Sequence, residues 1–465
     1  MPAKKKRKMV QKIESPETKK VAKLVRNGSA SAGATTSTAK PARKPQPARL
    51  VRLTAAELIE EVRGSRVLSC GESAFGALGH GEDRTELLKP RLVASLEGRD
   101  VVQVVAGGIH SLVLERNGTV LTCGPNDSGA VPVTDEGETV YEFTEIESLR
   151  NFRAAHGKPV YLVAGANFSA ALTDKGSVII WGSLRDDSGF LHNHSVLKSM
   201  QREPVVLVWH NEHQIVKIAA GENHLALLES NGRLYTVGDG MHGQLGRISQ
   251  RQGQCMRGTR AMSLARSKVV ADKEDTFKNV WCRGWWTVAQ AKNDRLYVCG
   301  VNNVGQLGLE PAGKQMDQLD YLTHSPNLCL SNGQSWRDIN GHMHHLLLLK
   351  HDGTVQSMGK NVDGLLGVEE AGNQQSHLCN VTLEPTLHVI GCTACTSGNI
   401  VWTDQGTAYA WGCDTVGQLG VGAGDSEVLT GAKKLSSKHL EGHKIVQVSL
   451  NDQHCLILAE KENEN

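Results

Sequence analysis

The stretch IVKIAAGENHLALLESNGRLYTVGDGMHGQLG, residues 215–246, decides the fold. It contains three short apolar runs, which are separated first by an Ala-Gly-x-x-His segment and then by Asn-Gly. Asn-Gly between two apolar runs is a strong signal for a β-hairpin, because both turn positions need a positive φ. The stretch therefore predicts three antiparallel strands, the last of which ends at Gly238.

The same unit recurs along the chain, at residues 101–124, 160–182, 279–300, 339–359 and 391–412. The glycines that end the third apolar run are 53 to 62 residues apart: Gly71, Gly124, Gly182, Gly238, Gly300, Gly359 and Gly412. Self-similarity at such a period indicates a propeller or a solenoid. Seven glycines predict seven units.

The two ends of the repeat region are complementary. The first unit, RVLSCGESAFGALG, lacks the Ala-Gly-x-x-His half, and the last, IVQVSLNDQHCLILAE, has only that half. We predict an all-β protein, a seven-bladed β-propeller over residues 53–460 that closes by pairing of its N- and C-terminal strands. Closure removes exposed sheet edges. A solenoid is the alternative, but it would need capping ends rather than complementary halves.

Residues 1–52 differ from this body in charge. They contain 15 Lys/Arg and 2 Asp/Glu, whereas the rest of the chain contains 36 and 47. Because the segment is rich in Ser, Thr, Ala and Pro, we predict a disordered basic N-terminal tail; residues 461–465 form a short polar tail. Five consecutive basic residues match a nuclear import signal or a phosphate-binding patch: Lys4, Lys5, Lys6, Arg7 and Lys8. They predict an import receptor and the phosphates of DNA as partners. A solvated leader without a partner is the alternative.

One unit breaks the register. In six units a second glycine follows the strand-ending glycine after five residues, but in WGSLRDDSGFLHNH, residues 181–194, Asp187 stands at that place and Gly189 comes two residues later. The break predicts a polar insertion in the third unit, with Gly189 permitting a tight bend. A polar loop between blades without a function is the alternative.

Composition excludes several classes of protein. No run of 18 apolar residues occurs, so no membrane span is predicted. The 11 cysteines are scattered, which favours buried thiols in a reducing compartment. The CxxC spacing at Cys392 and Cys395 has no second pair, so we predict neither a metal site nor a cofactor.

The repeated AGxxHxxxL…DGxVYxWGxxxxGQLG pattern resembles the repeat of the regulator of chromosome condensation family. Within that family, the chain further resembles the chromatin-bound members that act on the small GTPase Ran. Three features carry this resemblance: a body made almost entirely of seven units, the basic tail, and WGSLRDDSGF in the third unit. The resemblance implies a guanine nucleotide exchange factor that accelerates nucleotide release without covalent chemistry. It also implies a monomer, bound to chromatin in the nucleus, that contacts Ran, core histones and nucleosomal DNA.

The resemblance also implies which residues act. A β-wedge that pushes against the GTPase nucleotide site corresponds to Arg185, Asp186, Asp187, Ser188, Gly189 and Phe190. The GTPase-binding face corresponds to His110, Asn223, His224, Arg247, His345 and His454. A basic loop at residues 246–268, which contains Arg251, Arg257 and Arg260, corresponds to a histone-binding loop.

Alternatives remain for each of these assignments. The repeat histidines could satisfy turn backbone within each blade, and the basic loop could be a solvated excursion. The family often has acidic residues where this chain has Ala74, Ala166 and Asn223, so a different polar set is expected on the face. A propeller scaffold without exchange activity is the alternative function. A plant ultraviolet receptor is disfavoured because GWW occurs only once.

Overall fold

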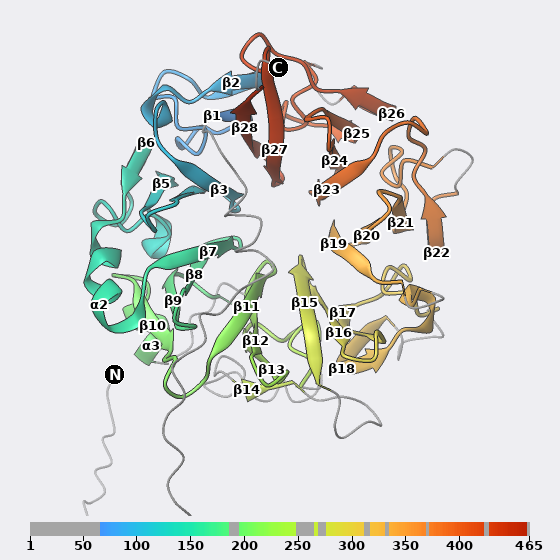
Figure 1. Cartoon of the computed structure of the whole chain (residues 1–465), viewed down its shortest axis with the longest axis horizontal. Helices are drawn as coiled ribbons and strands as arrows, with labels where there is room; N and C mark the ends of the chain where they lie inside the picture. The colour runs from blue at the N-terminus through green and yellow to red at the C-terminus, as the bar shows by residue number, and fades with distance from the viewer. Residues whose placement is uncertain are drawn as a thin grey trace, which may run out of the picture. The chain divides into compact units, whose positions relative to one another are not determined.

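A computed structural model describes residues 66–185, 195–247, 265–267, 276–310, 317–330, 334–368, 372–422 and 427–462. These residues form seven four-stranded antiparallel sheets arranged around one axis (Figure 1). The prediction of an all-β, seven-bladed propeller is confirmed. No helix in these ranges is long and apolar enough to cross a bilayer.

Six sheets consist of consecutive strands. The first three are β3 (Val101–Ala106), β4 (Ser111–Glu115), β5 (Val120–Pro125) and β6 (Thr139–Glu145); β7 (Pro159–Ala164), β8 (Phe168–Thr173), β9 (Val178–Gly182) and β10 (Val205–Val208); and β11 (Ile215–Ala220), β12 (His224–Glu229), β13 (Leu234–Gly238) and β14 (Ala265–Arg266). The next three are β15 (Phe277–Arg283), β16 (Trp286–Ala291), β17 (Leu296–Val301) and β18 (Gln318–His324); β19 (Trp336–His342), β20 (His345–Lys350), β21 (Val355–Lys360) and β22 (Gln374–Asn380); and β23 (Val389–Ala394), β24 (Gly398–Thr403), β25 (Ala408–Asp414) and β26 (Glu427–Lys434).

The seventh sheet closes the ring from both ends of the repeat region. Its order is β2 (Glu86–Leu92), β1 (Arg66–Glu72), β28 (His454–Lys461) and β27 (His443–Leu450). Strand β1 pairs with β28 from Arg66 opposite Ala459 to Gly71 opposite His454. The predicted pairing of N- and C-terminal strands is therefore confirmed.

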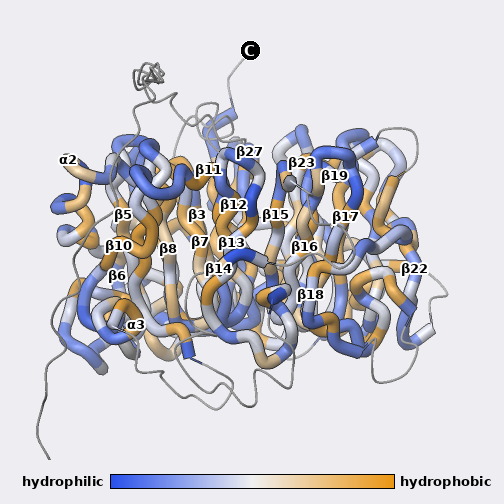
Figure 2. The backbone as a smooth tube through the Cα atoms, turned by 90° about the horizontal axis from the view of Figure 1, so that it is seen from below, coloured by the Kyte–Doolittle hydropathy of each residue, from blue (hydrophilic) through white to orange (hydrophobic). Residues whose placement is uncertain are grey.

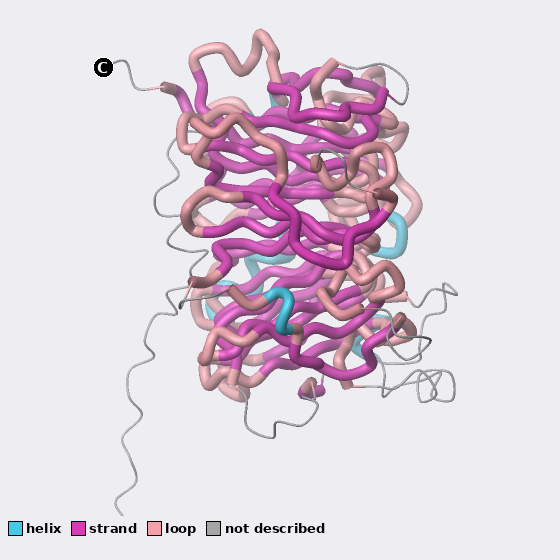
Figure 3. Tube along the Cα trace, turned by 90° about the vertical axis from the view of Figure 1, so that its right-hand side faces the viewer, coloured by secondary structure: helices cyan, strands magenta, loops and turns pink. Residues whose placement is uncertain are grey.

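Helices are few and short, and they lie in the connections. They are the 3-10 turns at Ala94–Leu96, Asp127–Gly129, Glu147–Phe152 and Pro326–Leu328, and the α-helices α2 (Arg153–His156) and α3 (Ser195–Ser199). The strands cross the thickness of the propeller, and the loops gather at its two faces (Figure 3). Apolar residues concentrate along the strands and polar ones at the loops (Figure 2).

The core lies between neighbouring sheets, and this explains why the strands are apolar on both faces. All six residues of β8 are buried. Leu112 of β4 packs in one cluster with Ile179 and Trp181 of the next sheet. A sheet covered on both faces gives continuous apolar runs rather than strict alternation.

The innermost strands surround the axis (Figure 1), and polar side chains join them. The amide of Gln103 on β3 donates to Leu162 O (2.9 Å) and accepts from Leu162 N (2.9 Å) on β7. Gln447 on β27 accepts from Val104 N (3.1 Å). These bonds tie one blade to the next where no strand pairing does.

Candidate functional site

The face of interest carries the turns between the first and second strands of each blade, such as Gly221–His224. We call it the AG-turn face. Four of its turns are joined through their backbones: Gly108 N donates to Gly165 O (3.1 Å), Ala166 N donates to Glu222 O (2.9 Å), and Glu222 N donates to Gly284 O (2.8 Å). A rim held by backbone hydrogen bonds provides a rigid platform.

The strand-ending glycines bring a second set of loops to the same face. Gly238 lies opposite His224 with φ +117°, and a Cβ at this position would lie 2.4 Å from Asn223 O and 2.7 Å from the His224 Cα. Only glycine fits such a close backbone approach at positive φ. The loop that leaves each third strand therefore starts against the AG turn of its own blade.

In five blades a side chain two residues after the strand-ending glycine caps the loop. The acceptors are Ser73, Asn126, Asn302, Asn361 and Asp414, each bonded to a backbone N–H four or five residues on, at 2.9 to 3.2 Å. The third unit has Leu184 at this position, and Leu184 is buried in the apolar core. A leucine cannot accept a hydrogen bond. Gly240 of the fourth unit provides no side-chain acceptor either, yet that loop is regular. The signal specific to the third unit is Asp187, at the place where the other six units have glycine.

The insertion starts and ends at a fixed base. Gly182 N donates to Met200 O (2.8 Å), and Ser183 N donates to Asn167 O (2.7 Å) in the AG turn. At the C-terminal end of the insertion, Gln201 Nε2 donates a hydrogen bond to the Ser183 hydroxyl (3.1 Å). Both ends of the insertion are thus anchored on the AG-turn face.

Only Arg185 of the predicted wedge lies within the described residues. Its Nε donates to the Ser183 hydroxyl at 3.1 Å, and its side chain is partly buried. Asp186, Asp187, Ser188, Gly189 and Phe190 lie outside the described residues, as do Arg251, Arg257 and Arg260 and the basic run Lys4 to Lys8.

The four repeat histidines are buried, and each is hydrogen-bonded to the next blade. The pairs are His454 Nε2 with Ser111 Oγ (2.9 Å), His110 Nε2 with Ser169 Oγ (2.7 Å), His224 Nε2 with Thr287 Oγ1 (2.9 Å) and His345 Nε2 with Asn399 Oδ1 (3.0 Å). Each ring is at most 1% exposed. Of the sequence alternatives, a structural role fits this burial, but the bonds join blades rather than satisfying turn backbone within one blade.

The other three blades replace both members of the pair by apolar or small residues. The histidine position is occupied by Phe168, Trp286 and Gly398 in these blades. The position that carries the hydroxyl or amide in the next blade is occupied, in the same order, by Leu225, Leu346 and Cys455. A buried polar group needs a partner, so the two positions change together. Each intact pair contributes about 0.5–1.5 kcal/mol to the free energy of unfolding.

Burial keeps these imidazoles neutral. It lowers the pKa of His110 to about 3, with a smaller contribution from His454, and it lowers the pKa of His224 to about 3. It also lowers the pKa of His345 and of His454 to about 4. The inter-blade bonds of the histidines hold the AG turns that precede them in the chain, and the histidine side chains are buried.

The remaining predicted face residues differ in exposure. Arg247 is 8% exposed, its Nε donates to the Thr236 hydroxyl (3.1 Å), and burial lowers its pKa to about 10. Asn223 is half-buried on the AG turn, and its carbonyl accepts from Asp239 N (2.7 Å). Asn223 is therefore accessible to a partner, whereas Arg247 mainly supports the strand edge.

Two polar clusters on this face were not predicted from the sequence. Thr396 donates its backbone N–H to Asp452 Oδ1 (2.7 Å), and its hydroxyl is bonded to His342 Nδ1 (2.8 Å). The His242 ring stacks on Trp285, with ring centroids 4.2 Å apart. The first cluster joins three blades. The sequence signal for it is His342, which stands where the AG motif has its glycine.

Within the described ranges, no group of three His, Cys, Asp or Glu residues is arranged to hold a metal ion. Cys392 and Cys395 are buried free thiols, and burial raises the pKa of Cys395 to about 12. The geometry offers a rigid, polar platform with an anchored insertion, which suits macromolecular binding.

Comparison with known proteins places these features in one family of folds. A family model described as the RCC1-like domain matches residues 66–457. The chain is 32% identical over 407 residues to the regulator of chromosome condensation of Xenopus laevis, covering 86% of this chain and 91% of that protein. It is 26% identical over 422 residues to the guanine nucleotide exchange factor SRM1 of Saccharomyces cerevisiae, covering 81% and 83%.

A solved structure is also similar. Prp20p from Saccharomyces cerevisiae, which was studied for its binding to Gsp1p and histones, superposes with a TM-score of 0.77 at 21% identity. The match covers 90% of this chain and 97% of that one. At this identity the likeness concerns the propeller fold alone.

Proposed function

The chain belongs to the regulator of chromosome condensation family, and on that premise we propose that it is a guanine nucleotide exchange factor for the nuclear GTPase Ran. The observation that carries the proposal is the insertion after Gly182, which is anchored at both ends on the rigid AG-turn face. The exchange-factor name of one relative and the binding of Prp20p to Gsp1p support it.

The physical problem for such a factor is differential affinity. Small GTPases hold guanine nucleotides at an affinity that reaches ~pM, or roughly −16 kcal/mol. The factor must bind the nucleotide-free GTPase better than the nucleotide-bound form, because a ligand shifts an equilibrium only by its difference in affinity for the two states. A rigid face supplies the affinity for the GTPase, and a protruding element supplies the difference in affinity between its nucleotide-free and nucleotide-bound forms.

We assign these two roles to separate groups of residues. Arg185 to Phe190 form the wedge that clashes with bound nucleotide. Asn223, Glu222, Asp452 and Trp285 form the accessible part of the GTPase-binding face. His110, His224, His345 and His454 act indirectly, through the inter-blade bonds that fix the AG turns, and Arg247 supports the same face from beneath.

Attachment to chromatin is assigned to the basic segments. The run Lys4 to Lys8 serves import and contacts DNA phosphates, and Arg251, Arg257 and Arg260 contact histone carboxylates, for which the planar guanidinium is well suited. The binding of Prp20p to histones supports this assignment. The protein would then act as a chromatin-bound monomer in the nucleus.

A complex with nucleotide-free Ran distinguishes this proposal from a scaffold without exchange activity. We expect the purified chain and Ran to elute together in size-exclusion chromatography once nucleotide has been removed, and to separate when GDP or GTP is added. A scaffold would bind Ran equally well with and without nucleotide, or would not bind it. Either outcome would contradict the proposal.

A further inference from the structure

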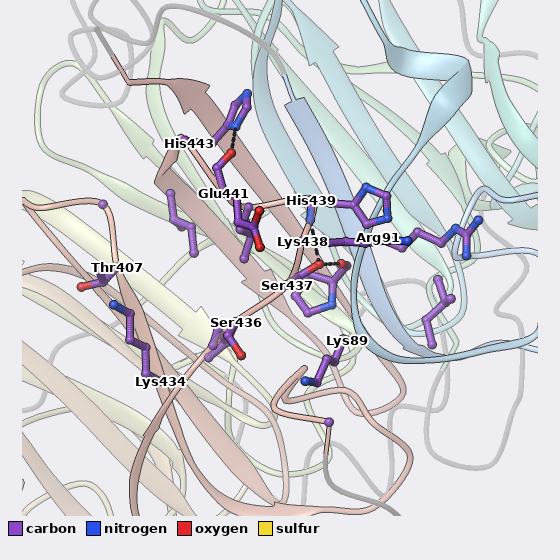
Figure 4. Close-up of a pocket in the computed structure, with 18 of the residues that line it drawn as sticks. Lys89, Arg91, Thr407, Lys434, Ser436, Ser437, Lys438, His439, Glu441 and His443 are labelled. Carbon is purple, nitrogen blue, oxygen red and sulfur yellow. Dashed lines mark hydrogen bonds between the residues drawn. The ribbon is translucent and has the colours of Figure 1, made fainter. Parts of the chain in front are cut away.

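A second candidate site lies between the sixth and seventh blades, away from the AG-turn face. It is a cavity of about 970 Å³, bordered by β2, the end of β26, and the connection from Leu435 to His443 (Figure 4). The hairpin turn at Gln405–Gly406 also lines it. None of its lining residues belongs to an AG turn or to the insertion, so the proposed exchange mechanism does not involve it.

Four Lys and Arg side chains and three glutamates line the cavity, so cations outnumber carboxylates there, whereas carboxylates outnumber cations in the propeller as a whole. Lys89, Arg91, Lys434 and Lys438 line it, with His439 and His443. Figure 4 shows Lys434 and Lys89 on the two sides of the segment that begins at Ser436. None of the four Lys and Arg side chains forms an ion pair with another residue in the described part of the chain.

Neighbouring groups respond to this concentration of positive charge. The pKa of His80 is lowered to about 4 by burial and then by Arg91 and Arg84. The pKa of His439 is also lowered, by burial and then by Lys438 and Arg91. The cations therefore repel further positive charge, and their field is available to an anionic ligand.

The other side chains that line the cavity determine which class of anionic ligand it fits. Leu87, Leu88 and Leu440 line the cavity beside the cations and are half-buried, and Ser437 is held by a hydrogen bond from its hydroxyl to Pro90 O. A site for phosphate alone would have no need of aliphatic side chains, and 970 Å³ is far larger than one such ion. The mixed lining fits several residues of a chain that carries both carboxylates and aliphatic groups.

We propose that this cavity binds an extended acidic peptide of a partner protein, with carboxylates on Lys89, Lys434 and Lys438 and aliphatic side chains on Leu87, Leu88 and Leu440. Glu86, Glu441 and Glu462 also line the cavity, and they disfavour a ligand with uniformly dense negative charge. This binding is independent of nucleotide exchange and goes beyond the proposed function.

The test is fluorescence anisotropy of a fluorescein-labelled peptide of alternating glutamate and leucine, titrated with the full chain. We expect K434E/K438E to weaken binding by about tenfold or more, because two attractive charges become repulsive. The matched control K292E/K433E changes the net charge equally at two exposed lysines outside the cavity, and it should bind like the natural chain. Because all four lysines are exposed, the variants are expected to fold, which thermal unfolding checks.

Further arms of the experiment identify the ligand class and the location. A glutamine–leucine peptide should bind at least ~tenfold more weakly, and a photo-crosslinker in the peptide should label residues 86–91 or 434–443. Equal binding by K434E/K438E and K292E/K433E, or cross-links only to the basic tail, would overturn the proposal. Binding of tripolyphosphate or duplex DNA at this site in preference to the peptide would overturn it too. Exchange activity on Ran should be the same in both variants, so failure here is distinguishable from failure of the exchange proposal.

Discussion

Deletion of Asp186–Phe190 is expected to slow the release of GDP from Ran by up to ~100-fold relative to the intact chain. The reason is that the wedge supplies the difference in affinity between nucleotide-free and nucleotide-bound Ran, and coupling between two ligands of one protein is typically about 1–3 kcal/mol. The measurement is the release rate of a fluorescent GDP analogue from Ran at saturating exchange factor.

The deletion should leave the propeller intact, because the base of the insertion is held by residues that remain. Ser183 stays bonded to Asn167, and Gly182 to Met200. The matched control E384A/D404A removes two exposed carboxylates that lie outside the AG turns. It should release GDP from Ran at the same rate as the intact chain. If the deletion variant has the same unfolding midpoint and the same exchange rate as the intact chain, the wedge assignment is wrong.

Acidification from pH 7.5 to pH 5 is expected to destabilise the propeller by about 2 kcal/mol for each inter-blade histidine. The folded pKa values of His110, His224, His345 and His454 lie at about 3 to 4, below the unfolded value of 6.5. Between these values the unfolded chain binds protons that the folded chain does not. The stability is fully present above pH 6.5 and is lost progressively as the pH falls toward 4.

Urea unfolding at the two pH values measures this effect. Burial raises the pKa of Asp338, which works in the opposite direction, so the histidines are best isolated by substitution. H110Q/H454Q should reduce the pH-dependent change in the free energy of unfolding by about 4 kcal/mol. The control H351Q alters an exposed histidine and should leave the change as it is. Equal pH dependence of all three proteins would show that the buried histidines do not titrate as described.

The fold could be predicted from the sequence because its determinants are local and repeated. Gly238 marks the end of a third strand through its own backbone conformation, and the complementary half-units determine which strands must pair. The position of the insertion was also accessible, since Asp187 stands where the other six units have glycine.

What the sequence did not reveal depends on contacts between neighbouring blades. His110 meets Ser169 across 59 positions, and Thr396 meets Asp452 across 56. Such pairs become visible only when the blades are superposed and the next blade is known. The burial of Arg247 has the same origin, because its strand edge is completed by Tyr321 of the neighbouring blade. The face residues a partner can reach were therefore predicted less well than the fold.

The central claim is tested most directly by stopped-flow release of fluorescent GDP from Ran. With excess unlabelled nucleotide present, the release rate should rise with the concentration of the chain and reach a plateau, while another small GTPase releases its nucleotide at the intrinsic rate. Release from Ran at the intrinsic rate at every concentration of folded chain would contradict the account.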